Sequence, residues 1–474
     1  MRGFALLLLA VIGVGEPAIA APPVERDAIP SAAERVDALA RRLAEQDRFS
    51  GVLAVAHDGE PLFVHAYGLA DRANRVPVRP DDAFALASVG KMFTAVAILQ
   101  LVSSGRLSLD DTVGKVLPDY PNREIATKVT VRMLLTHSGG TGDIPIFGKE
   151  DAANRQNLRT VADYVNALGT RPPEFEPGSK EAYSNYGFVL LGRMIEKLSG
   201  QNYYDYIREH IFLPAGMTHS GYPLRDEPAA GIATGYTATD WDLHPTTLHA
   251  NTDTLPWRGS PAGGGVASAP DLLRFVTALQ SGKLLPQAFF QQAITAQTPG
   301  IGLGFWLDGE GRTFRWAHGG GAWGMNADVR VFPNAGYAIV CLANRDPQVA
   351  DRIADYFEAL LAGPRPATQL FLRGTMNDWS TATPMQMTGD LYRVELALKA
   401  GSYEFKIASA DWKTVDLGDG GFGPTTIRER ALAAPLSTHG ANIHLDVPTD
   451  GRYAFELRGL ADGDPRVGVR PVDK

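Results

Sequence analysis

Apolar residues recur at helical spacing near residue 40 and again near residue 355. A Ser-x-x-Glu capping-box pattern begins at Ser31, and apolar residues follow at positions 36, 39, 40 and 43. This spacing of three and four predicts a helix with one apolar face. The same period returns over 349–360 and predicts a second, closing helix.

Strand-like runs follow the first predicted helix and precede the closing one. Residues 52–56 and 62–66 flank Asp58-Gly59, and residues 327–332 and 337–342 flank a turn at 334–336. Such pairs predict antiparallel hairpins. With a mainly helical stretch between them, they predict one α+β unit over residues 30–362. Its antiparallel sheet is flanked by the terminal helices and joined by a mainly helical subdomain.

The pattern changes after a Gly-Pro-Arg-Pro break at Gly363, and residues 363–368 are expected to form a linker. Beyond it, short runs alternate between apolar and polar residues and are separated by turns that contain Gly and Asp. This alternation predicts a small all-β sandwich over residues 369–474.

The N-terminus has the pattern of a signal peptide over residues 1–20. Arg2 precedes an apolar run over 4–14, and Ala18-Ile19-Ala20 is a small-x-small cleavage site. That run is too short to span a bilayer as a helix, and no later segment is apolar enough. No cysteine lies close after this apolar run, so we expect no lipid or membrane anchor after cleavage. The sequence predicts a periplasmic or secreted protein.

Composition excludes several other classes of function. The 474 residues carry a net charge of −8 with no Lys/Arg-rich run, so no nucleic-acid partner is expected. The ten histidines form no His-Glu-x-x-His or His-x-His-x-Asp motif, and we expect neither a metal nor an organic cofactor. The single cysteine, Cys341, lies in an apolar run and is predicted to be an inert core residue.

The strongest local candidate for chemistry is Ser88-Val89-Gly90-Lys91, at the start of an apolar helical stretch over 92–102. Lys91 would lie one turn after Ser88, on the same helix face. A serine hydroxyl needs a neighbouring base, and a lysine can supply one if burial lowers its pKa. The alternative is that Ser88 only caps the helix and that Lys91 is a solvated side chain.

Two further clusters follow at wide spacing. Tyr183-Ser184-Asn185 precedes an apolar run over 188–195; a tyrosine can relay a proton, and an asparagine can orient the lysine or a substrate carbonyl. His318-Gly319-Gly320-Gly321 follows a strand-like run over 313–317. Glycines there let a substrate lie against the strand, and a backbone N–H can complete an oxyanion hole.

In this order and spacing, the three clusters resemble the penicillin-recognising serine hydrolases over residues 35–362. More narrowly, they are similar to the branch of class C β-lactamases, D-Ala-D-Ala carboxypeptidases and esterases. The resemblance implies the following roles: Ser88 as nucleophile, Lys91 as its activating partner, Tyr183 as general base and acid, Asn185, His318, Gly319 and Gly320 in substrate binding, and the N–H groups of Ser88 and Gly321 as oxyanion hole.

Two departures from the family pattern bear on the substrate. Its third motif usually begins with lysine followed by a hydroxyl residue, whereas His318 and Gly319 stand here. Because histidine is only partly charged near neutral pH, both changes favour an ester, a D-amino-acid peptide or a related amide over a β-lactam. A β-lactamase or D-Ala-D-Ala carboxypeptidase is the alternative. A non-catalytic glycan- or peptidoglycan-binding protein on this scaffold is a further one.

Two other features have competing interpretations. His137, beside Ser138, is predicted to be structural rather than catalytic. The segment over 367–460 resembles the immunoglobulin-like modules of pullulanases, which implies a polysaccharide partner bound through Trp379 and Trp412. The alternative is that both tryptophans close the sandwich core and that the module is a spacer.

Overall fold

A computed structural model describes residues 28–145, 157–227, 230–363, 368–420, 426–428 and 434–472. The predicted signal peptide lies outside these residues, as do residues 364–367 of the predicted linker. Within the described ranges, no helix is long and apolar enough to cross a membrane.

A six-stranded antiparallel sheet forms the centre of the N-terminal part, in the order β2-β1-β12-β11-β10-β9. Its strands are β1 (Gly51–His57), β2 (Glu60–Tyr67), β9 (Trp306–Asp308), β10 (Arg315–Ala322), β11 (Met325–Phe332) and β12 (Tyr337–Ala343). Both predicted hairpins are present in it. Successive side chains of a strand point to opposite faces, and in β1 both sets are buried, so elements must cover the sheet on both sides.

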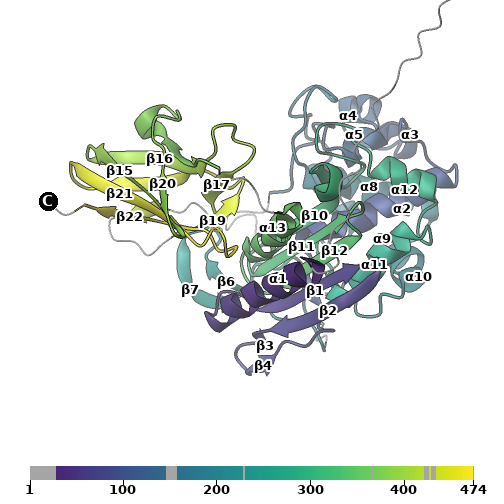
Figure 1. Cartoon of the computed structure of the whole chain (residues 1–474). Helices are drawn as coiled ribbons and strands as arrows, with labels where there is room; N and C mark the ends of the chain where they lie inside the picture. The colour runs from purple at the N-terminus through teal and green to yellow at the C-terminus, as the bar shows by residue number, and fades with distance from the viewer. Residues whose placement is uncertain are drawn as a thin grey trace, which may run out of the picture.

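One face is covered by α1 (Ala28–Glu45) and α13 (Val349–Ala362), the two predicted terminal helices (Figure 1). α1 begins three residues before the predicted cap at Ser31, because the helical turn continues back to Ala28. Leu53 of β1 and Cys341 of β12 belong to the core under these helices. Burial raises the pKa of the Cys341 thiol well above its usual value, as expected of an unreactive core thiol.

The other face of the sheet packs against α11 (Ala269–Gln280) and a helical subdomain. Its remaining helices are α2 (Lys91–Ser103), α3 (Val113–Val116), α4 (Arg123–Lys128), α5 (Val131–Leu135), α7 (Val161–Leu168), α8 (Asn185–Ser199), α9 (Tyr203–Ile207), α10 (Leu213–Ala215) and α12 (Gln287–Ala293). Every residue of α2 from Lys91 to Leu99 is buried, and Lys91 is the one charged residue among them.

Six short strands edge this unit in two-stranded pairs. They are β3 (Leu69–Asp71), β4 (Val76–Pro77), β5 (Phe84–Ala85), β6 (Tyr236–Thr239), β7 (Pro245–Ala250) and β8 (Val266–Ala267). The pair β5–β8 joins the segment before Ser88 to the segment after residue 260, which brings a glycine-rich loop against the serine.

The C-terminal part is all β, as the alternation predicted (Figure 1). Its strands are β13 (Phe371–Gly374), β14 (Gln386–Thr388), β15 (Leu391–Leu398), β16 (Gly401–Ala408), β17 (Asp416–Asp419), β18 (Thr426–Arg428), β19 (Ala434–Thr438), β20 (Ile443–Val447), β21 (Gly451–Arg458) and β22 (Arg466–Pro471). Strand β19 pairs with both β17 and β22, and Phe405 of β16 meets Phe455 of β21 edge to face across one core. The predicted fold class, α+β followed by a small all-β sandwich, is confirmed.

The two parts touch through α1, α13 and the turn between β21 and β22. Arg48 makes two hydrogen bonds of 2.6 and 2.7 Å to the Asp464 carboxylate. Arg352 of α13 lies 3.6 Å from the same carboxylate, with its side chain only 7% exposed. The Tyr356 ring packs against Gly463, where any side chain would clash with it.

Candidate active site

Ser88 lies in a tight turn, η1 (Ala87–Gly90), directly before α2. Ala87 has a φ of 44°, a conformation that costs free energy in a residue with a side chain and therefore needs support. Support comes from the glycine-rich loop, because the Gly264 N–H donates to the Ala87 carbonyl at 2.7 Å. A side chain at Gly90 or Gly263 would collide with this contact. The loop therefore fixes the backbone that carries Ser88.

Two side chains converge on the Ser88 hydroxyl. The Tyr183 hydroxyl donates to Ser88 Oγ at 2.7 Å, and Lys91 Nζ donates to the same atom at 3.1 Å. Tyr183 precedes α8, whose first turn is capped by the Ser184 side chain accepting from the Gly187 N–H. That cap fixes where α8 begins and so where Tyr183 and Asn185 lie. The predicted trio of Ser88, Lys91 and Tyr183 is thus brought together.

Lys91 is surrounded by neutral oxygens. Besides Ser88 Oγ, its ammonium contacts Asn185 Oδ1 at 2.7 Å and the Ala262 carbonyl. Burial lowers the pKa of Lys91 to about 7, and the nearby Asp143 carboxylate opposes that shift. A large fraction of this lysine is therefore uncharged near neutral pH, as a proton acceptor requires.

Tyr183 packs against other rings. Its side chain is 40% exposed, while its hydroxyl is turned onto Ser88. The His137 ring lies 4.5 Å away on one side, and Trp306 is stacked at 6.2 Å. Burial of the hydroxyl raises the pKa of Tyr183, although the Ser88 hydrogen bond opposes this. The phenol is therefore protonated at neutral pH.

Asn185 is oriented by Asp143. One Asp143 carboxylate oxygen accepts from the Asn185 backbone N–H at 2.8 Å, and the other accepts from Asn185 Nδ2 at 3.2 Å. Because Nδ2 is held in this way, Oδ1 of the same amide must face Lys91. Asp143 thus acts on the lysine through the asparagine as well as through its charge.

His137 has a packing role and is uncharged near neutral pH. Its Nδ1 accepts from the Ser184 backbone N–H at 3.2 Å, at the start of α8. Burial, together with the charge of Lys91, lowers the pKa of His137 to about 3. It is a neutral ring that supports Tyr183, in agreement with the structural role predicted for it.

The third predicted cluster forms the middle of β10. Strand β9 pairs with residues 315–317, so the edge of His318–Gly321 that faces away from β11 has no strand partner among the described residues. A Cβ on Gly320 would lie 2.3 Å from the Leu86 carbonyl oxygen and 2.9 Å from Ser88 N. Only glycine permits this approach of β10 to the serine turn.

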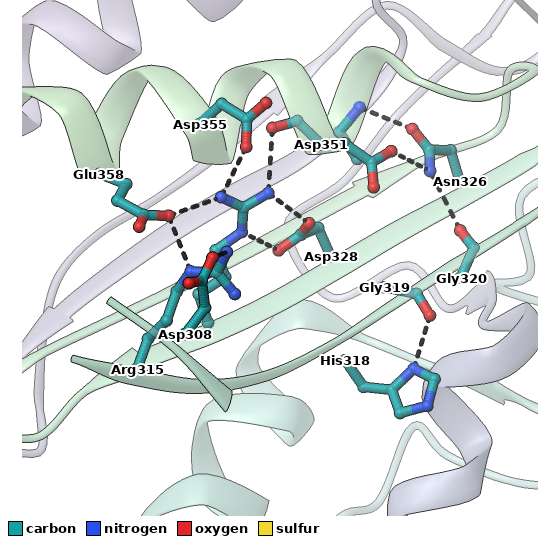
Figure 2. A network of polar contacts seen from close by, with 12 residues as sticks. Asp308, Arg315, His318, Gly319, Gly320, Asn326, Asp328, Asp351, Asp355 and Glu358 are labelled. Atoms are coloured by element: carbon teal, nitrogen blue, oxygen red, sulfur yellow. Dashed lines mark hydrogen bonds and ion pairs between the residues drawn. The ribbon is translucent and has the colours of Figure 1, made fainter. Parts of the chain in front are cut away.

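A buried amide holds this strand from behind (Figure 2). Asn326 Nδ2 donates to the Gly320 carbonyl at 3.0 Å and to Asp351 Oδ2 at 2.8 Å, and its Oδ1 accepts from the Ala350 N–H at 2.7 Å. The Gly320 carbonyl therefore points toward β11. Since neighbouring residues of a strand point their backbone groups to opposite edges, the Gly321 N–H points toward the cleft.

His318 is buried and neutral. Its Nδ1 donates to the Gly319 carbonyl at 2.7 Å, which leaves Nε2 as the acceptor nitrogen (Figure 2). Burial and the charge of Lys91 lower the pKa of His318 to about 3. An ionic contact from His318 to a substrate carboxylate is therefore not expected near neutral pH.

Behind β10, a second buried network surrounds Arg330, and Figure 2 labels three of its partners, Asp328, Asp355 and Glu358. The guanidinium donates two hydrogen bonds of 3.0 Å to the Asp328 carboxylate and lies 2.7 Å from Asp355 and 2.9 Å from Glu358. Burial alone would lower the pKa of Arg330, but these carboxylates outweigh it and raise that pKa well above its usual value. Its charge is permanent.

A cavity of about 380 Å³ opens at Ser88 and Asn185. Gly321 and the glycine-rich loop form part of its wall, and most of the remaining lining is apolar. The larger apolar lining residues are Ile144, Pro223, Leu224, Ile232, Leu255, Pro256, Trp323 and Met325. This volume suits a small ligand of mainly apolar surface.

One group of possible metal ligands occurs among the described residues, formed by Asp240, Asp242 and His244. Asp240 Oδ1 already accepts from the backbone N–H groups of Asp242 and His244, so the cluster is accounted for as a turn.

Trp379 and Trp412 lie side by side in the C-terminal part. Their ring centroids are 6.1 Å apart at 42°, and the Arg373 guanidinium lies 3.9 Å from the Trp412 ring. Both rings are partly exposed, and neither belongs to the sandwich core. The alternative in which they close that core has no support in these contacts.

Three contributors to the site were not found from the sequence: Asp143, Ala262 and Trp306. Ala262 acts through its carbonyl, and a backbone group has no signature of its own. Asp143 and Trp306 lie far along the chain from the residues they contact, and nothing local distinguishes them from other aspartates and tryptophans.

The sheet with its terminal helices and the helical subdomain define a protein of the β-lactamase fold. The chain belongs to the Beta-lactamase family, whose family model matches residues 36–363.

Penicillin-binding protein 4* of Bacillus subtilis is 30% identical over 308 residues, which cover 61% of this chain. The match spans 66% of the length of that protein, slightly under two thirds. Esterase EstB of Burkholderia gladioli is 30% identical, over 58% of this chain and 79% of its own. The crystal structure of a penicillin-binding protein from Bacillus halodurans superimposes with a TM-score of 0.61 at 29% identity, covering 69% of this chain and 99% of that one.

Proposed function

We propose that this protein is an exported serine hydrolase that works through an acyl-enzyme formed on Ser88. The observation that carries the proposal is the double contact on Ser88 Oγ from Tyr183 and from Lys91. A merely capping serine would bond to backbone N–H groups of its helix, whereas here two titratable side chains address its hydroxyl.

In the proposed acylation step, Ser88 Oγ attacks the carbonyl carbon of the substrate. Neutral Lys91, rather than Tyr183 as the resemblance implied, takes the serine proton, since its pKa of about 7 suits it as a base and the pKa of Tyr183 is raised. Tyr183 is protonated before the step because its pKa is raised. It then passes its hydroxyl proton to the leaving oxygen or nitrogen and receives a proton from Lys91. The products are the Ser88 acyl ester and the protonated leaving group. Water then cleaves this ester and restores the serine.

The negative charge that develops on the substrate oxygen needs donors in the cleft. The N–H groups of Ser88 and Gly321 are the proposed pair. Ser88 lies in the turn that opens α2, where the helix dipole adds positive potential. Gly321 is exposed on the unpaired edge of β10. Such donors contribute about 10²–10³ to the rate of acyl transfer elsewhere.

The proposed substrates are an ester, a D-amino-acid peptide or a related amide. The name of the Burkholderia relative supports the ester. The neutral state of His318 weakens the case for recognition of a substrate carboxylate by this strand, as would be expected in a D-Ala-D-Ala carboxypeptidase or a β-lactamase. These remain the alternative activities of the same site. A non-catalytic binding protein would not need the contacts on Ser88.

The test compares the mature protein with its Ser88→Ala variant on a short-chain p-nitrophenyl ester and on a chromogenic cephalosporin. We expect the ester to be hydrolysed faster, and the variant to lose about a thousandfold or more in kcat. Electrospray mass spectrometry of a quenched reaction should show one acyl group on the native protein and none on the variant.

Ser104→Ala, at the exposed end of α2, is the matched control and should leave the rate unchanged. Equal rates in the native and Ser88→Ala proteins would mean that the serine mechanism is wrong. Faster turnover of the cephalosporin would favour the β-lactamase alternative.

A second function is proposed for the C-terminal part, which is binding of a polysaccharide through Trp379 and Trp412. Two partly exposed rings that lie side by side offer apolar faces on which sugar rings can stack. Affinity electrophoresis of the full chain through gels with and without soluble starch tests this. Retardation that disappears in Trp379→Ala and Trp412→Ala supports it, and equal migration in gels with and without starch or another soluble glucan contradicts it.

A further inference from the structure

The cleft contains a fixed positive charge that the proposed reaction does not use. Arg258 lines the same cavity as Ser88 and pairs with Leu224, another lining residue, through an antiparallel β-bridge. The residue is only partly buried.

Arg258 is held in place by groups that leave its charge uncompensated. Its guanidinium lies 3.7 Å from the centre of the Tyr204 ring, and Nε donates to the Tyr222 carbonyl at 2.6 Å. The Tyr204 hydroxyl donates to the carbonyl of Gly259, the next residue, at 3.0 Å. An aromatic face and a carbonyl orient a guanidinium without cancelling its charge.

In the part of the chain that the structure describes, no carboxylate lies within ion-pair distance of Arg258, and its two terminal nitrogens have no hydrogen-bond partner. Its neighbour in the wall differs, because Arg225 Nε donates to Asp226 at 3.1 Å. Glu227 also lines the cavity, but it is exposed and therefore screened by water. The cavity thus offers an oriented cationic fork within mainly apolar walls.

We propose that Arg258 binds a carboxylate carried by the substrate at a distance from its scissile bond, so that the preferred substrate is a small, largely apolar ester or amide with one negative charge. This inference rests on the proposed function, since it concerns the substrate of the same site. One planar guanidinium with two free nitrogens matches a carboxylate, which it can bind with two parallel hydrogen bonds.

The acid group could belong to the acyl part or to the leaving group, and matched esters distinguish the two. The acyl pair is the mono-p-nitrophenyl ester of glutaric acid and the same compound capped as its methyl ester. The leaving-group pair is 4-acetoxybenzoate and its methyl ester. We expect the native protein to prefer the acid over its capped partner, in kcat/KM, by about tenfold or more in one pair, as a charged hydrogen bond contributes elsewhere.

In Arg258→Gln this preference should fall to near unity, mainly through KM, while the capped esters are hydrolysed as before. Arg258→Lys should keep part of the preference. Arg225→Gln, which removes the same charge from the same wall, is the matched control and should change the preference by less than about threefold.

Absence of any preference for the acids in the native protein would overturn the proposal, and so would an equal loss on acids and capped esters in Arg258→Gln. After subtraction of the spontaneous rate, Ser88→Ala must lose about a thousandfold or more of the activity on all four compounds. If it does not, the proposed function fails, whatever Arg258 does.

Discussion

Lys91 and Arg330 are both buried cations near the serine turn and β10, but oxygens of different charge surround them. Lys91 touches a hydroxyl, an amide oxygen and a backbone carbonyl, all neutral, and burial lowers its pKa to about 7. Arg330 touches three carboxylates, which raise its pKa. The first environment favours loss of the proton, and the second makes the charge permanent. Burial alone therefore does not decide what a cation does; its neighbours do.

The largest effect should follow from removing the cation that can lose its proton. In Lys91→Met we expect kcat/KM on a neutral ester to fall by about a thousandfold or more, because Ser88 loses its base. The melting temperature should stay the same or rise, since a desolvated ammonium is replaced by an apolar chain of similar length. Stopped-flow or steady-state ester assays and calorimetry measure the two quantities.

The exposed Lys399, whose side chain is 84% accessible, provides the control, and Lys399→Met should change neither activity nor melting. A Lys91→Met protein that melts far below the native one would show that the lysine is a structural ion instead.

Removing the permanent cation should have the opposite balance of effects. Arg330→Met leaves Asp328 and its neighbours without compensation, and we expect the free energy of unfolding to fall by about 3–5 kcal/mol. Urea denaturation followed by tryptophan fluorescence measures this. The double variant Arg330→Met/Asp328→Asn should recover part of the loss. A single variant as stable as the native protein would contradict the assignment.

The amide between the two environments should affect rate more than binding. Asn326→Leu removes the hydrogen bond to the Gly320 carbonyl and so loosens the strand that carries the Gly321 N–H. We expect kcat to fall about ten- to a hundredfold while KM changes by less than about threefold, because the oxyanion exists only in the transition state.

Asn334→Leu, at the exposed β11–β12 turn, is the matched control for this variant. If Asn326→Leu changed KM and kcat in equal measure, the amide would have a general structural role.

The smallest effect should appear with pH. Because base catalysis needs neutral Lys91, kcat/KM on a neutral ester should rise about tenfold between pH 6 and pH 8 and level off above a midpoint near 7. The histidines beside it cannot produce this rise, since His137 and His318 titrate near 3. A profile flat across this range would show that proton removal by Lys91 does not limit the rate.

Local patterns predicted what one element encodes by itself. Ser88 and Lys91 stand one helical turn apart, and Tyr183 and Asn185 flank a helix start, so the proximity within each pair follows from helix geometry alone. The two hairpins of the sheet followed from apolar runs that flank turns, whereas the short strand β9 was not predicted. The start of α1 was placed three residues late, because the Ser31 pattern looked like a cap but lies inside the helix.

What sequence reasoning missed depends on contacts between distant segments. Ala262 stabilises Lys91 through a carbonyl, and Asp143 reaches Asn185 across 42 positions. The neutral state of His318 follows from its burial, which depends on packing and not on its neighbours in sequence. The uncompensated charge of Arg258 likewise depends on its contacts with Tyr204 and Tyr222, which are distant in the sequence.

The contact between Arg48 and Asp464 has a consequence for the cooperativity of unfolding. The Asp464 carboxylate lies near Arg48, Arg352 and Arg466, and Arg352 Nε is buried without a hydrogen-bond partner. A shortened chain that ends at Gly363 would lack Asp464 and would leave Arg48, which follows α1, and Arg352 of α13 without this carboxylate. Asp464 of the sandwich therefore compensates the charges of Arg48 and Arg352 in the N-terminal part. We expect the two parts to unfold together, as a single calorimetric transition of the whole chain.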